Sequence, residues 1–431
     1  MKSILYLPTR FFPSISGAEF YFQRMAEIIS IDYKFKIDIF TSNAIDFKAL
    51  RNEKGKTIKP QDKYYSKVNH LNIKRFPVNY DASEKDILKR LKAIPTFDKL
   101  DLNEECLKIF IKNGPYLEDL LIEILNTPNL DYDLIHTTFF PYFNCIISLI
   151  VGTFINKPVV CTPFFHFSNP RYLDFRLTEV LKKFDLIIAC TNLEREFLIK
   201  KCSISPSKIK VVPLGVDYDK FKITNKTSLR HDSFKQKFFN RKERNYKLIL
   251  FCGYKNYEKG AISILKSIPS ILKKIKNIYF VFIGPSTIAF NSELSKISKL
   301  EKLRVINFTP ENLSGYYDKK KLAVFKEADI YLMPSRSDAF GISFLEAWSA
   351  GKPVIGARTG ATPEVVREGI DGLLVEFDNP EDIAEKVIYL LKNKRLRKKL
   401  GSAGQLKVYQ KYTWENIAKE TVKIYKNLKK Y

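Results

Sequence analysis

The feature that most constrains the fold is a regular alternation of short β-branched runs with longer helical spacers. Strands of a parallel sheet appear as short, nearly continuous apolar runs, because helices cover both faces of such a sheet. In the first half of the chain the runs lie at residues 3–7, 37–40, 133–136, 159–161 and 186–189. This alternation predicts an α/β domain with a parallel sheet.

The alternation stops in a charged segment at 224–245 and then starts again, with runs at 248–251, 279–282, 330–333 and 354–356. A chain of 431 residues is also longer than one hydrophobic core usually supports. We therefore expect two domains with a cleft available between them. The expected limits are 1–220 for the first domain, 221–245 for a linker, 246–412 for the second domain, and 413–431 for a C-terminal helix that packs back on the first domain.

Two segments depart from the alternation. Segment 43–129 is rich in Lys, Asp and Asn, and we interpret it as an insertion that shapes a substrate site, because loops on a rigid scaffold often determine binding. Segment 139–155 is uncharged and nearly long enough to span a membrane. It contains Pro141, Asn144 and Ser148, however, and strand-like runs flank it, which favours a buried helix.

Cysteine usage and the N-terminus bear on the compartment. The six cysteines stand singly, with no C-x-x-C pair, which is typical of reduced core residues. Arg10 interrupts the first apolar run too early for a signal peptide. We therefore expect a cytoplasmic protein.

The charge balance is strongly basic. Lys and Arg number 73 against 47 Asp and Glu, which gives a net charge of +26. This excess attracts polyanions such as nucleic acid or anionic membranes, although lysines that only solvate the surface explain it equally well. The stretch 87–94 is basic and amphipathic, which is typical of a helix on an anionic membrane. We therefore expect either peripheral attachment to the inner face of the membrane or, with equal weight, lysines spread over the whole surface that only keep the protein soluble.

The segment richest in chemistry is 334–347, which follows an apolar run and opens a predicted helix, as anion sites do. Gly341 lets the backbone approach a ligand, and the first-turn N–H groups around Ile342 point to where a phosphate would lie. Asp338 and Glu346 bracket this site at roughly 12 Å, from about 1.5 Å per helical residue. That separation suits the two sugars of a nucleotide-diphosphate sugar. Acids that merely flank a helix start would explain Asp338 but not Glu346, which lies in an apolar turn.

At this motif the chain resembles the retaining glycosyltransferases of family four, also called the glycosyl transferases group 1 family. Their GT-B fold has two Rossmann-like domains whose parallel sheets face a central cleft, with the acceptor on the side of the first domain. The family's E-x7-E motif is similar to Asp338-x7-Glu346. The resemblance implies that Glu346 holds the donor ribose, that Asp338 lies beside the donor sugar as a catalytic residue, and that Phe340, Gly341 and Ile342 contact the donor. Asp in place of the family's first Glu shortens the reach by one methylene.

Three further segments resemble the family in the same order along the chain. Segment 12–19 is similar to its first glycine-rich loop, whose backbone approaches the donor diphosphate, and Gly17 keeps the glycine of that loop. Segment 212–217 is similar to the end of the first domain. Gly360 begins a turn that is similar to one facing the donor cleft.

Segment 253–260 is similar to the family motif G-R-x-x-x-x-K-G, in which Arg and Lys neutralise the diphosphate. Lys259 matches the lysine. Tyr254 occupies the arginine position, and we expect Lys255 to supply the missing cation, without the bidentate fork of arginine. The alternative, a solvated lysine that binds nothing, is more serious for Lys255 than for Lys259.

Two histidines end predicted strands. His166 follows the run at 159–161, where α/β sheets bind ligands, and it resembles the family's T-x-H histidine at the reaction centre. We assign it a catalytic role. For His136 the simpler account is a packed imidazole with one hydrogen bond.

Two D-x-D triplets, 131–133 and 217–219, could suggest metal ligands. Both lie where capping and turn acids are common, and no His/Cys/acid cluster indicates a tight metal site. We expect metal-independent donor binding and no cofactor, since the nucleotide sugar is a substrate.

These features predict a hexosyltransferase that passes a sugar, with retention, from a nucleotide-diphosphate sugar to a lipid-linked or polysaccharide acceptor. Basic groups and backbone donors would stabilise the leaving diphosphate. The resemblance implies that the donor phosphate accepts the acceptor's proton. One alternative is a nucleotide-sugar epimerase on the same fold, which would form product without an acceptor. The other is a nucleic-acid-binding protein, for which the sequence shows charge but no recognised motif.

Overall fold

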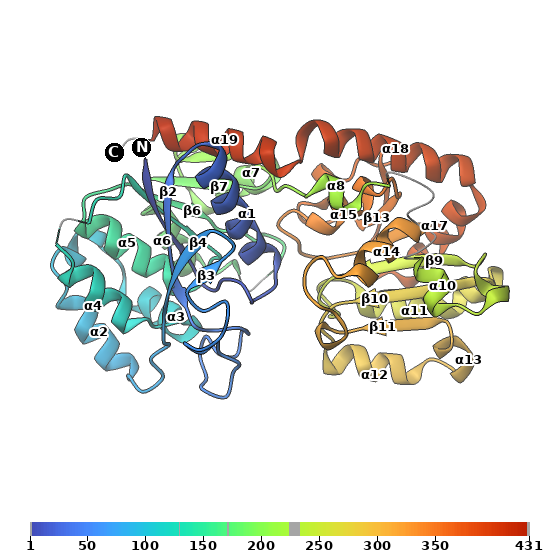
Figure 1. The fold of residues 1–431 in the computed structure, drawn as a ribbon, viewed down its shortest axis with the longest axis horizontal. Coiled ribbons are helices and arrows are strands. Elements are labelled where there is room, and N and C mark those ends of the chain that lie inside the picture. The colour runs from blue at the N-terminus through green and yellow to red at the C-terminus, as the bar shows by residue number, and fades with distance from the viewer. Residues whose placement is uncertain (1, 129, 170–171, 224–232, 429–431) are drawn as a thin grey trace. The chain divides into compact units, whose positions relative to one another are not determined.

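The computed structural model describes residues 2–128, 130–169, 172–223 and 233–428. The chain forms two compact units (Figure 1). The first consists of Met1–Pro213 together with Trp414–Tyr431, and the second of Leu214–Thr413. Each unit is built around its own sheet, as the interrupted alternation predicts.

The first unit contains an eight-stranded sheet in the order β3-β4-β2-β1-β5-β6-β7-β8. Neighbouring strands are parallel except for β3 and β4, and every run predicted from the sequence in this half is a strand. The strands are β1 (Ser3–Pro8), β2 (Lys36–Ser42), β3 (Lys67–Val68), β4 (Leu71–Phe76), β5 (Leu134–Thr138), β6 (Val159–Thr162), β7 (Leu186–Ala189) and β8 (Ile209–Val211). The helices are α1 (Gly17–Asp32), α2 (Glu84–Lys92), α3 (Glu104–Asn113), α4 (Glu118–Asn126), α5 (Asn144–Phe154), α6 (Phe175–Lys182), α7 (Asn192–Cys202) and α19 (Trp414–Asn427), with 3-10 turns at Phe97–Leu100 and Pro206–Lys208.

The segment interpreted as an insertion, 43–129, is partly a structural element of the first unit. Its strand β4 pairs with β2 inside the sheet, and its helices contribute Ile87, Leu91 and Phe110 to the main hydrophobic core. The described part of this segment therefore both completes the sheet and supplies surface loops.

The stretch 87–94 does not present an apolar face to the surroundings. Its four aliphatic side chains, Ile87, Leu88, Leu91 and Ile94, are at most 9% exposed and pack in the core. The prediction of a membrane-facing helix in this stretch is wrong, because the apolar face that the amphipathic pattern revealed is already covered. The periodicity alone does not distinguish a core from a membrane as the apolar partner.

Segment 139–155 contains α5, whose residues Asn144–Gly152 are buried, so the predicted buried helix is confirmed. None of the helices in the described ranges is both long and apolar enough to cross a membrane.

The last helix, α19, belongs to the first unit and lies beside α1 (Figure 1). The Trp414 ring contacts Phe20 of α1, with ring centroids 5.9 Å apart. Nearer its end, the Tyr425 hydroxyl lies 3.0 Å from the Tyr6 hydroxyl on β1, and the Tyr425 carbonyl accepts a 2.6 Å hydrogen bond from Lys2. The helix thus seals one face of the central strands.

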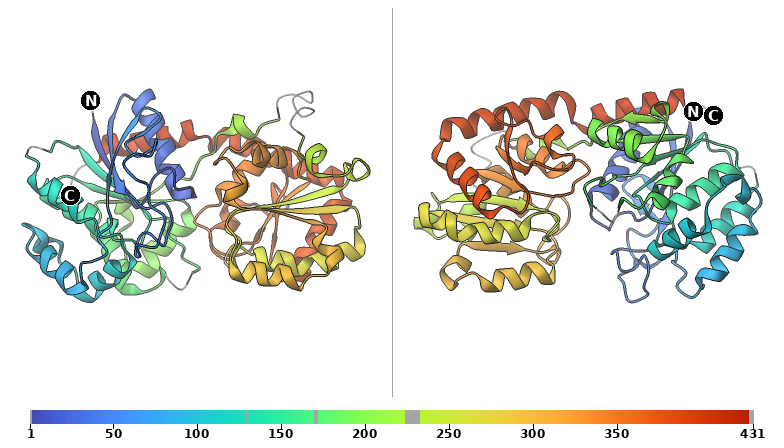
Figure 2. Two further views of the ribbon diagram at one scale, coloured as in Figure 1. Left: turned by 60° about the horizontal axis from the view of Figure 1, so that its bottom comes forward. Right: turned by 180° about the vertical axis from the view of Figure 1, so that it is seen from behind.

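The second unit contains a six-stranded, wholly parallel sheet in the order β11-β10-β9-β12-β13-β14, with helices on both faces (Figure 2). The strands are β9 (Lys247–Cys252), β10 (Ile278–Ile283), β11 (Val305–Phe308), β12 (Ile330–Met333), β13 (Val354–Ala357) and β14 (Gly372–Val375). The helices are α8 (Tyr218–Phe221), α10 (Phe234–Phe238), α11 (Ala261–Lys274), α12 (Ile288–Lys296), α13 (Lys299–Lys302), α14 (Lys319–Glu327), α15 (Ile342–Ser349), α16 (Thr362–Val365), α17 (Pro380–Lys392) and α18 (Lys394–Lys411), with 3-10 turns at Arg241–Glu243 and Pro310–Asn312.

The segment expected to be a linker, 221–245, is structured where it is described. The amide of Phe234 in α10 donates to the Glu327 carboxylate of α14 at 2.7 Å, and the Phe234 ring is buried. Residues 224–232 of the expected linker lie outside the described residues.

Both sheets have a point at which the strand order reverses. In the first sheet it lies between β1 and β5, and in the second between β9 and β12. In open α/β sheets, ligands bind outside the carboxyl ends of the strands at such a point. The loops that follow these strands are therefore the first places to look for a site.

Candidate functional site

Two loops at the reversal point of the second sheet are bonded to each other. The first follows β9 and ends at Gly260, and the second follows β12 and ends at Gly341. The backbone oxygen of Glu258 accepts hydrogen bonds from the Arg336 amide at 2.8 Å and from the Ser335 hydroxyl at 3.1 Å. The side chains of Arg336 and Glu258 also form an ion pair. Each loop therefore restricts the conformation of the other.

Gly260 sits where these loops come closest. Its φ is +73°, and a Cβ at this position would lie 2.2 Å from the Pro334 carbonyl oxygen. Both the backbone angle and the contact exclude a larger residue without a shift of the loops. The glycine of the G-R-x-x-x-x-K-G resemblance thus has a structural reason in this chain.

Lys259 and Asp338, one from each loop, form an ion pair. The Lys259 ammonium lies 2.7 Å from Asp338 Oδ2, and the two side chains are 22% and 15% exposed. The sequence predicted that Lys259 neutralises the donor diphosphate and that the Asp338 carboxylate lies beside the donor sugar. The structure places them against each other at the partly open edge of the sheet.

The N-terminus of α15 adjoins this pair. Gly341 precedes the helix with φ +92°, and Asp338 Oδ1 accepts a 3.4 Å hydrogen bond from the Phe340 amide. The side chains of Phe340 and Ile342 are buried, and the Phe340 ring contacts Tyr412 with a centroid separation of 5.5 Å. Phe340 and Ile342 can therefore offer a ligand mainly backbone groups, which suits the oriented N–H groups of a first helical turn.

Glu346 lies one helical turn further along α15 and is fully enclosed. Its side chain is 2% exposed, and Oε1 accepts a 2.7 Å hydrogen bond from the ammonium of Lys321 on α14. Burial, followed by the charge of Glu346, raises the pKa of the neighbouring Tyr316 well above its usual range. The carboxylate that looked unexplained in an apolar turn thus has a buried counter-charge.

Lys255 does not lie where the sequence placed it. Its ammonium is buried and donates to the Phe308 carbonyl at 2.9 Å and to the Asn307 side chain, and desolvation lowers its pKa to about 8. The structure therefore contradicts both interpretations, the diphosphate cation and the solvated lysine, because the ammonium is already bonded inside the unit. Tyr254, at the family's arginine position, is 45% exposed instead.

Gly360 follows β13, the neighbour of β12, and adopts φ +61° just before α16. It lies at the same carboxyl edge as the Lys259–Asp338 pair. The second unit therefore brings Lys259, Asp338, Gly341 and Gly360 to one edge, with Glu346 buried behind it.

In the first unit, the glycine-rich loop follows β1, and Gly17 is the exposed first residue of α1. Two buried arginines hold the loop. Arg10 pairs with Glu19 at 2.7 Å, and Arg75 donates to the backbone oxygen of Phe12. Burial lowers the pKa of Arg75 to about 10.

His166 is half-buried after β6, two strands from β1 at the same edge of the first sheet. Its carbonyl accepts a 2.8 Å hydrogen bond from the Asn169 amide, and its ring lies 5.1 Å from that of Tyr172. His136 is different, because its two ring nitrogens contact Tyr425 and Thr162 and desolvation lowers its pKa to about 3. The packed imidazole expected for His136 is confirmed, with two hydrogen bonds instead of one.

One acid of each D-x-D triplet has a structural partner. Asp133 accepts from the Ser3 amide at 2.7 Å, and Asp217 accepts from the Tyr317 hydroxyl. Among the described residues, no group of three or more His, Cys, Asp or Glu could hold a metal ion.

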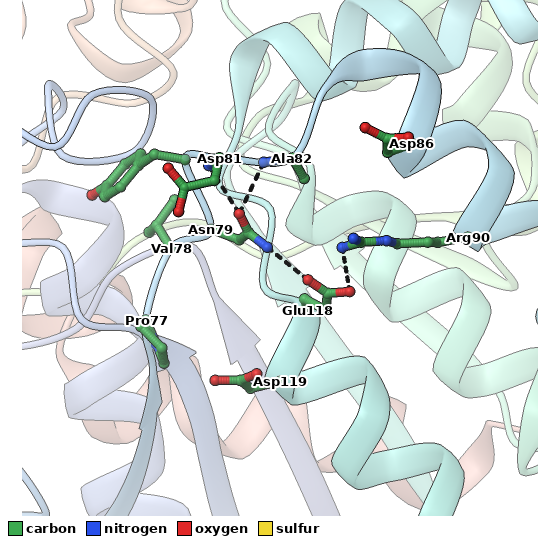
Figure 3. A pocket seen from close by; sticks show the side chains of 10 residues that line it. Pro77, Val78, Asn79, Asp81, Ala82, Asp86, Arg90, Glu118 and Asp119 are labelled. Carbon is green, nitrogen blue, oxygen red and sulfur yellow. Dashed lines mark hydrogen bonds and ion pairs between the residues drawn. The ribbon is translucent and has the colours of Figure 1, made fainter.

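A pocket of about 370 Å³ opens at the carboxyl end of β4, inside segment 43–129 (Figure 3). Asn79 occupies its centre, where its side chain donates to Glu118 at 2.6 Å and accepts from the amides of Asp81 and Ala82. Arg90 pairs with Glu118 across the pocket. The remaining charged groups of the lining are acidic: Asp81, Asp86 and Asp119. This lining suits hydroxyl or cationic groups of a ligand better than anionic ones.

Sequence reasoning missed Lys321, Arg336 and Glu258. Lys321 is 25 positions from Glu346 and carries no local signal, since it lies in a run of three lysines. Arg336 and Glu258 were visible inside the two motifs, but only the fold shows that they pair.

A doubly wound sheet in each unit, with loops converging at the reversal points, defines a protein of the GT-B class. Residues 232–407 match the family described as Glycosyl transferases group 1, and residues 106–220 match Glycosyltransferase Family 4. The chain therefore belongs to the glycosyltransferases that these two family descriptions cover.

Two relatives show how far the similarity extends. An uncharacterised glycosyltransferase of Methanocaldococcus jannaschii is 33% identical over 182 residues, which is 42% of this chain and 45% of the relative. A D-inositol 3-phosphate glycosyltransferase of Corynebacterium jeikeium is 28% identical over 256 residues, which is 58% of this chain and 59% of the relative. The chain thus matches about half the length of these relatives.

Solved structures with the same fold cover the whole chain. The HepE protein of Anabaena, in complex with UDP and glucose, superposes with a TM-score of 0.70 at 15% identity and covers 99% of this chain and 100% of that one. Sucrose-phosphate synthase of Thermosynechococcus elongatus superposes with a TM-score of 0.70 at 16% identity and covers 99% of this chain and 98% of that one. At these identities the likeness concerns the fold.

Proposed function

We propose that the protein is a retaining glycosyltransferase that transfers a sugar from a nucleoside-diphosphate sugar to a hydroxyl acceptor. The observation that carries the proposal is the edge formed by Lys259, Asp338 and the N-terminus of α15, with Glu346 behind it. A cation, a carboxylate and unpaired helix N–H groups are what a sugar diphosphate requires. The family membership and the UDP complexes of its structural relatives support this choice.

In the proposed reaction the bond between the sugar and the diphosphate breaks as the acceptor oxygen bonds to the same carbon. Negative charge grows on the leaving diphosphate, and Lys259 together with the first-turn N–H groups of α15 would stabilise it. The donor phosphate would accept the acceptor's proton, as the family resemblance implies. His166 would act at the reacting centre, and donor binding would need no metal.

The acceptor side of the proposal rests on the pocket at the end of β4. Its volume of about 370 Å³ and its Asp, Asn and Arg lining suit the hydroxyl groups of a saccharide or polyol. Its excess of carboxylates disfavours a phosphate in the pocket itself, so a lipid phosphate would have to lie outside it.

Attachment to an anionic membrane surface in the cytoplasm stays part of the proposal, supported now only by the net charge of +26. Sedimentation with anionic and neutral vesicles at low and high salt tests it. Equal binding to both vesicle types would exclude an electrostatic attachment. Neither the family match nor the site favours the epimerase or the nucleic-acid-binding alternative.

Calorimetric titration with UDP, GDP, ADP and their sugar conjugates tests the donor class. Glu346→Ala should weaken binding of the preferred nucleotide by roughly 1.5–3 kcal/mol, the range for hydrogen bonds to a charged group. No binding of any nucleotide by the wild type would reject the proposed function. Unchanged affinity in Glu346→Ala would reject the ribose role of Glu346.

A further inference from the structure

Lys321 and Glu346 form the most enclosed ion pair near the candidate donor site. The nitrogen and oxygen are 2.7 Å apart, and the side chains are 7% and 2% exposed. The pair joins α14 to α15, so each partner comes from a different helix. Burying two charges is unfavourable unless their geometry is good, and such pairs often add little to stability compared with apolar side chains.

Other groups around Lys321 also restrain its ammonium. It lies 3.8 Å from the centre of the Tyr316 ring, and the rings of Phe221 and Phe325 flank it at 5.5 and 5.7 Å. A cation over aromatic faces is attracted to them and has few alternative positions. Lys321 is therefore a fixed donor to Glu346 rather than a mobile surface lysine.

We propose that Lys321 is a positioning residue, which orients the Glu346 carboxylate so that it can accept hydrogen bonds from the ribose hydroxyls of the donor. This inference rests on the proposed function and assigns a role to a residue outside the family motifs. Lys321 occupies Oε1 and the Tyr316 side chain is a second hydrogen-bond partner of the carboxylate, which still has lone pairs that can accept further hydrogen bonds. Without Lys321, the carboxylate would lose the donor on α14 that fixes the position of Oε1, and its orientation toward a ligand would no longer be set by the packing of the two helices.

The second unit offers a closely matched control. Lys407 pairs with Asp371 at 2.9 Å, with side chains 8% and 0% exposed, and its ammonium lies 3.8 Å from the centre of the Trp348 ring. This pair has similar burial and also joins a lysine to a carboxylate, although Arg367 contacts the same carboxylate at 2.6 Å, and it does not include Glu346. Lys407→Met therefore reproduces the loss of a buried cation without disturbing the proposed ribose contact.

The experiment compares binding of a ribonucleoside diphosphate with its 2′,3′-dideoxy analogue by calorimetry, using whichever of UDP, GDP and ADP binds most tightly. Wild-type protein and Lys407→Met should prefer the ribonucleotide by roughly 10- to 100-fold, as expected for hydrogen bonds to a charged group. Lys321→Met should reduce this preference to a few-fold, and Lys321→Arg should restore most of it. In a Glu346→Gln background, Lys321→Met should cause no further change, because the two residues act as one unit.

A Lys321→Met protein that keeps the full ribose preference overturns the inference, and so does an equal loss in Lys407→Met. If Lys321→Met does not fold, Lys321→Gln removes the charge with less change in shape and is judged by the same criterion. A wild-type protein that binds the nucleotide and its dideoxy analogue equally would instead reject the ribose role of Glu346 itself. Failure of the positioning role and failure of the proposed function are thereby separated.

Discussion

The ion pair between Lys259 and Asp338 leads to a counter-intuitive prediction for Asp338→Asn. If Lys259 binds the donor diphosphate, it must give up all or part of its contact with Asp338. The variant should therefore bind a free nucleoside diphosphate more tightly than the wild type, although it should transfer sugar more slowly because the carboxylate beside the donor sugar is lost.

The magnitude follows from the exposure of the pair. At 22% and 15% exposure and a separation of 2.7 Å, the interaction is partly solvated, and ion pairs of this kind contribute at most about 1 kcal/mol. Removing this competition corresponds to a roughly five-fold lower Kd. The gain should shrink at higher salt, because salt screens the attraction between Lys259 and Asp338 that the variant removes.

Calorimetry with the preferred nucleoside diphosphate at two salt concentrations measures the effect. Asp378→Asn is the control, because it removes a carboxylate from the same unit whose partners are the hydroxyls of Tyr257 and Ser263 instead of a lysine. Unchanged or weaker binding in Asp338→Asn would refute the competition. An equal gain in Asp378→Asn would show that overall charge, and not the pair, is responsible.

Three further outcomes are expected. His166→Ala should abolish transfer and leave nucleotide affinity nearly intact, as measured by a transfer assay beside calorimetry, and turnover within a few-fold of the wild type would exclude the catalytic role. Gly260→Ala should lower the midpoint of thermal unfolding and weaken nucleotide binding, because φ is +73° and the new Cβ would meet the Pro334 oxygen at 2.2 Å; a variant with wild-type stability would contradict the close contact. The pKa of Lys255 is about 8 in the folded protein and 10.5 as its ordinary value, so the unfolded chain binds more protons between these pH values and stability should rise with pH across that window. Urea unfolding at pH 7.5 and 10 should show the wild type gaining stability relative to Lys255→Met, and a constant difference would refute the burial of an ionisable amine.

Local patterns in the sequence were enough to predict the sheets. The runs at 3–7 and 330–333 are strands because β-branched residues between helical spacers have few other ways to bury their side chains. The start of α17 is likewise determined locally, because the Asn379 side chain accepts from the Asp382 amide and Pro380 stands at the first helical position. These features depend on neighbours within a few positions.

Features that depend on distant partners could not be predicted in the same way. The direction of the Lys255 ammonium is decided by Asn307 and Phe308, more than fifty positions away. The apolar face of α2 was interpreted as a membrane-binding face, because the spacing of its apolar residues shows that this face is covered but not what covers it. The Lys321–Glu346 pair needed the packing of α14 on α15 to become visible.

The return of α19 to the first unit has a consequence for biosynthesis. A ribosome translates β1 before the second unit and α19 after it, so the Tyr6 hydroxyl and the His136 ring acquire their Tyr425 partner only when α19 emerges. The nascent first unit must therefore wait, with this polar cluster incomplete, while the entire second unit is translated. Chaperones that recognise unfinished β-sheet surfaces would have their best opportunity to bind this chain during that interval.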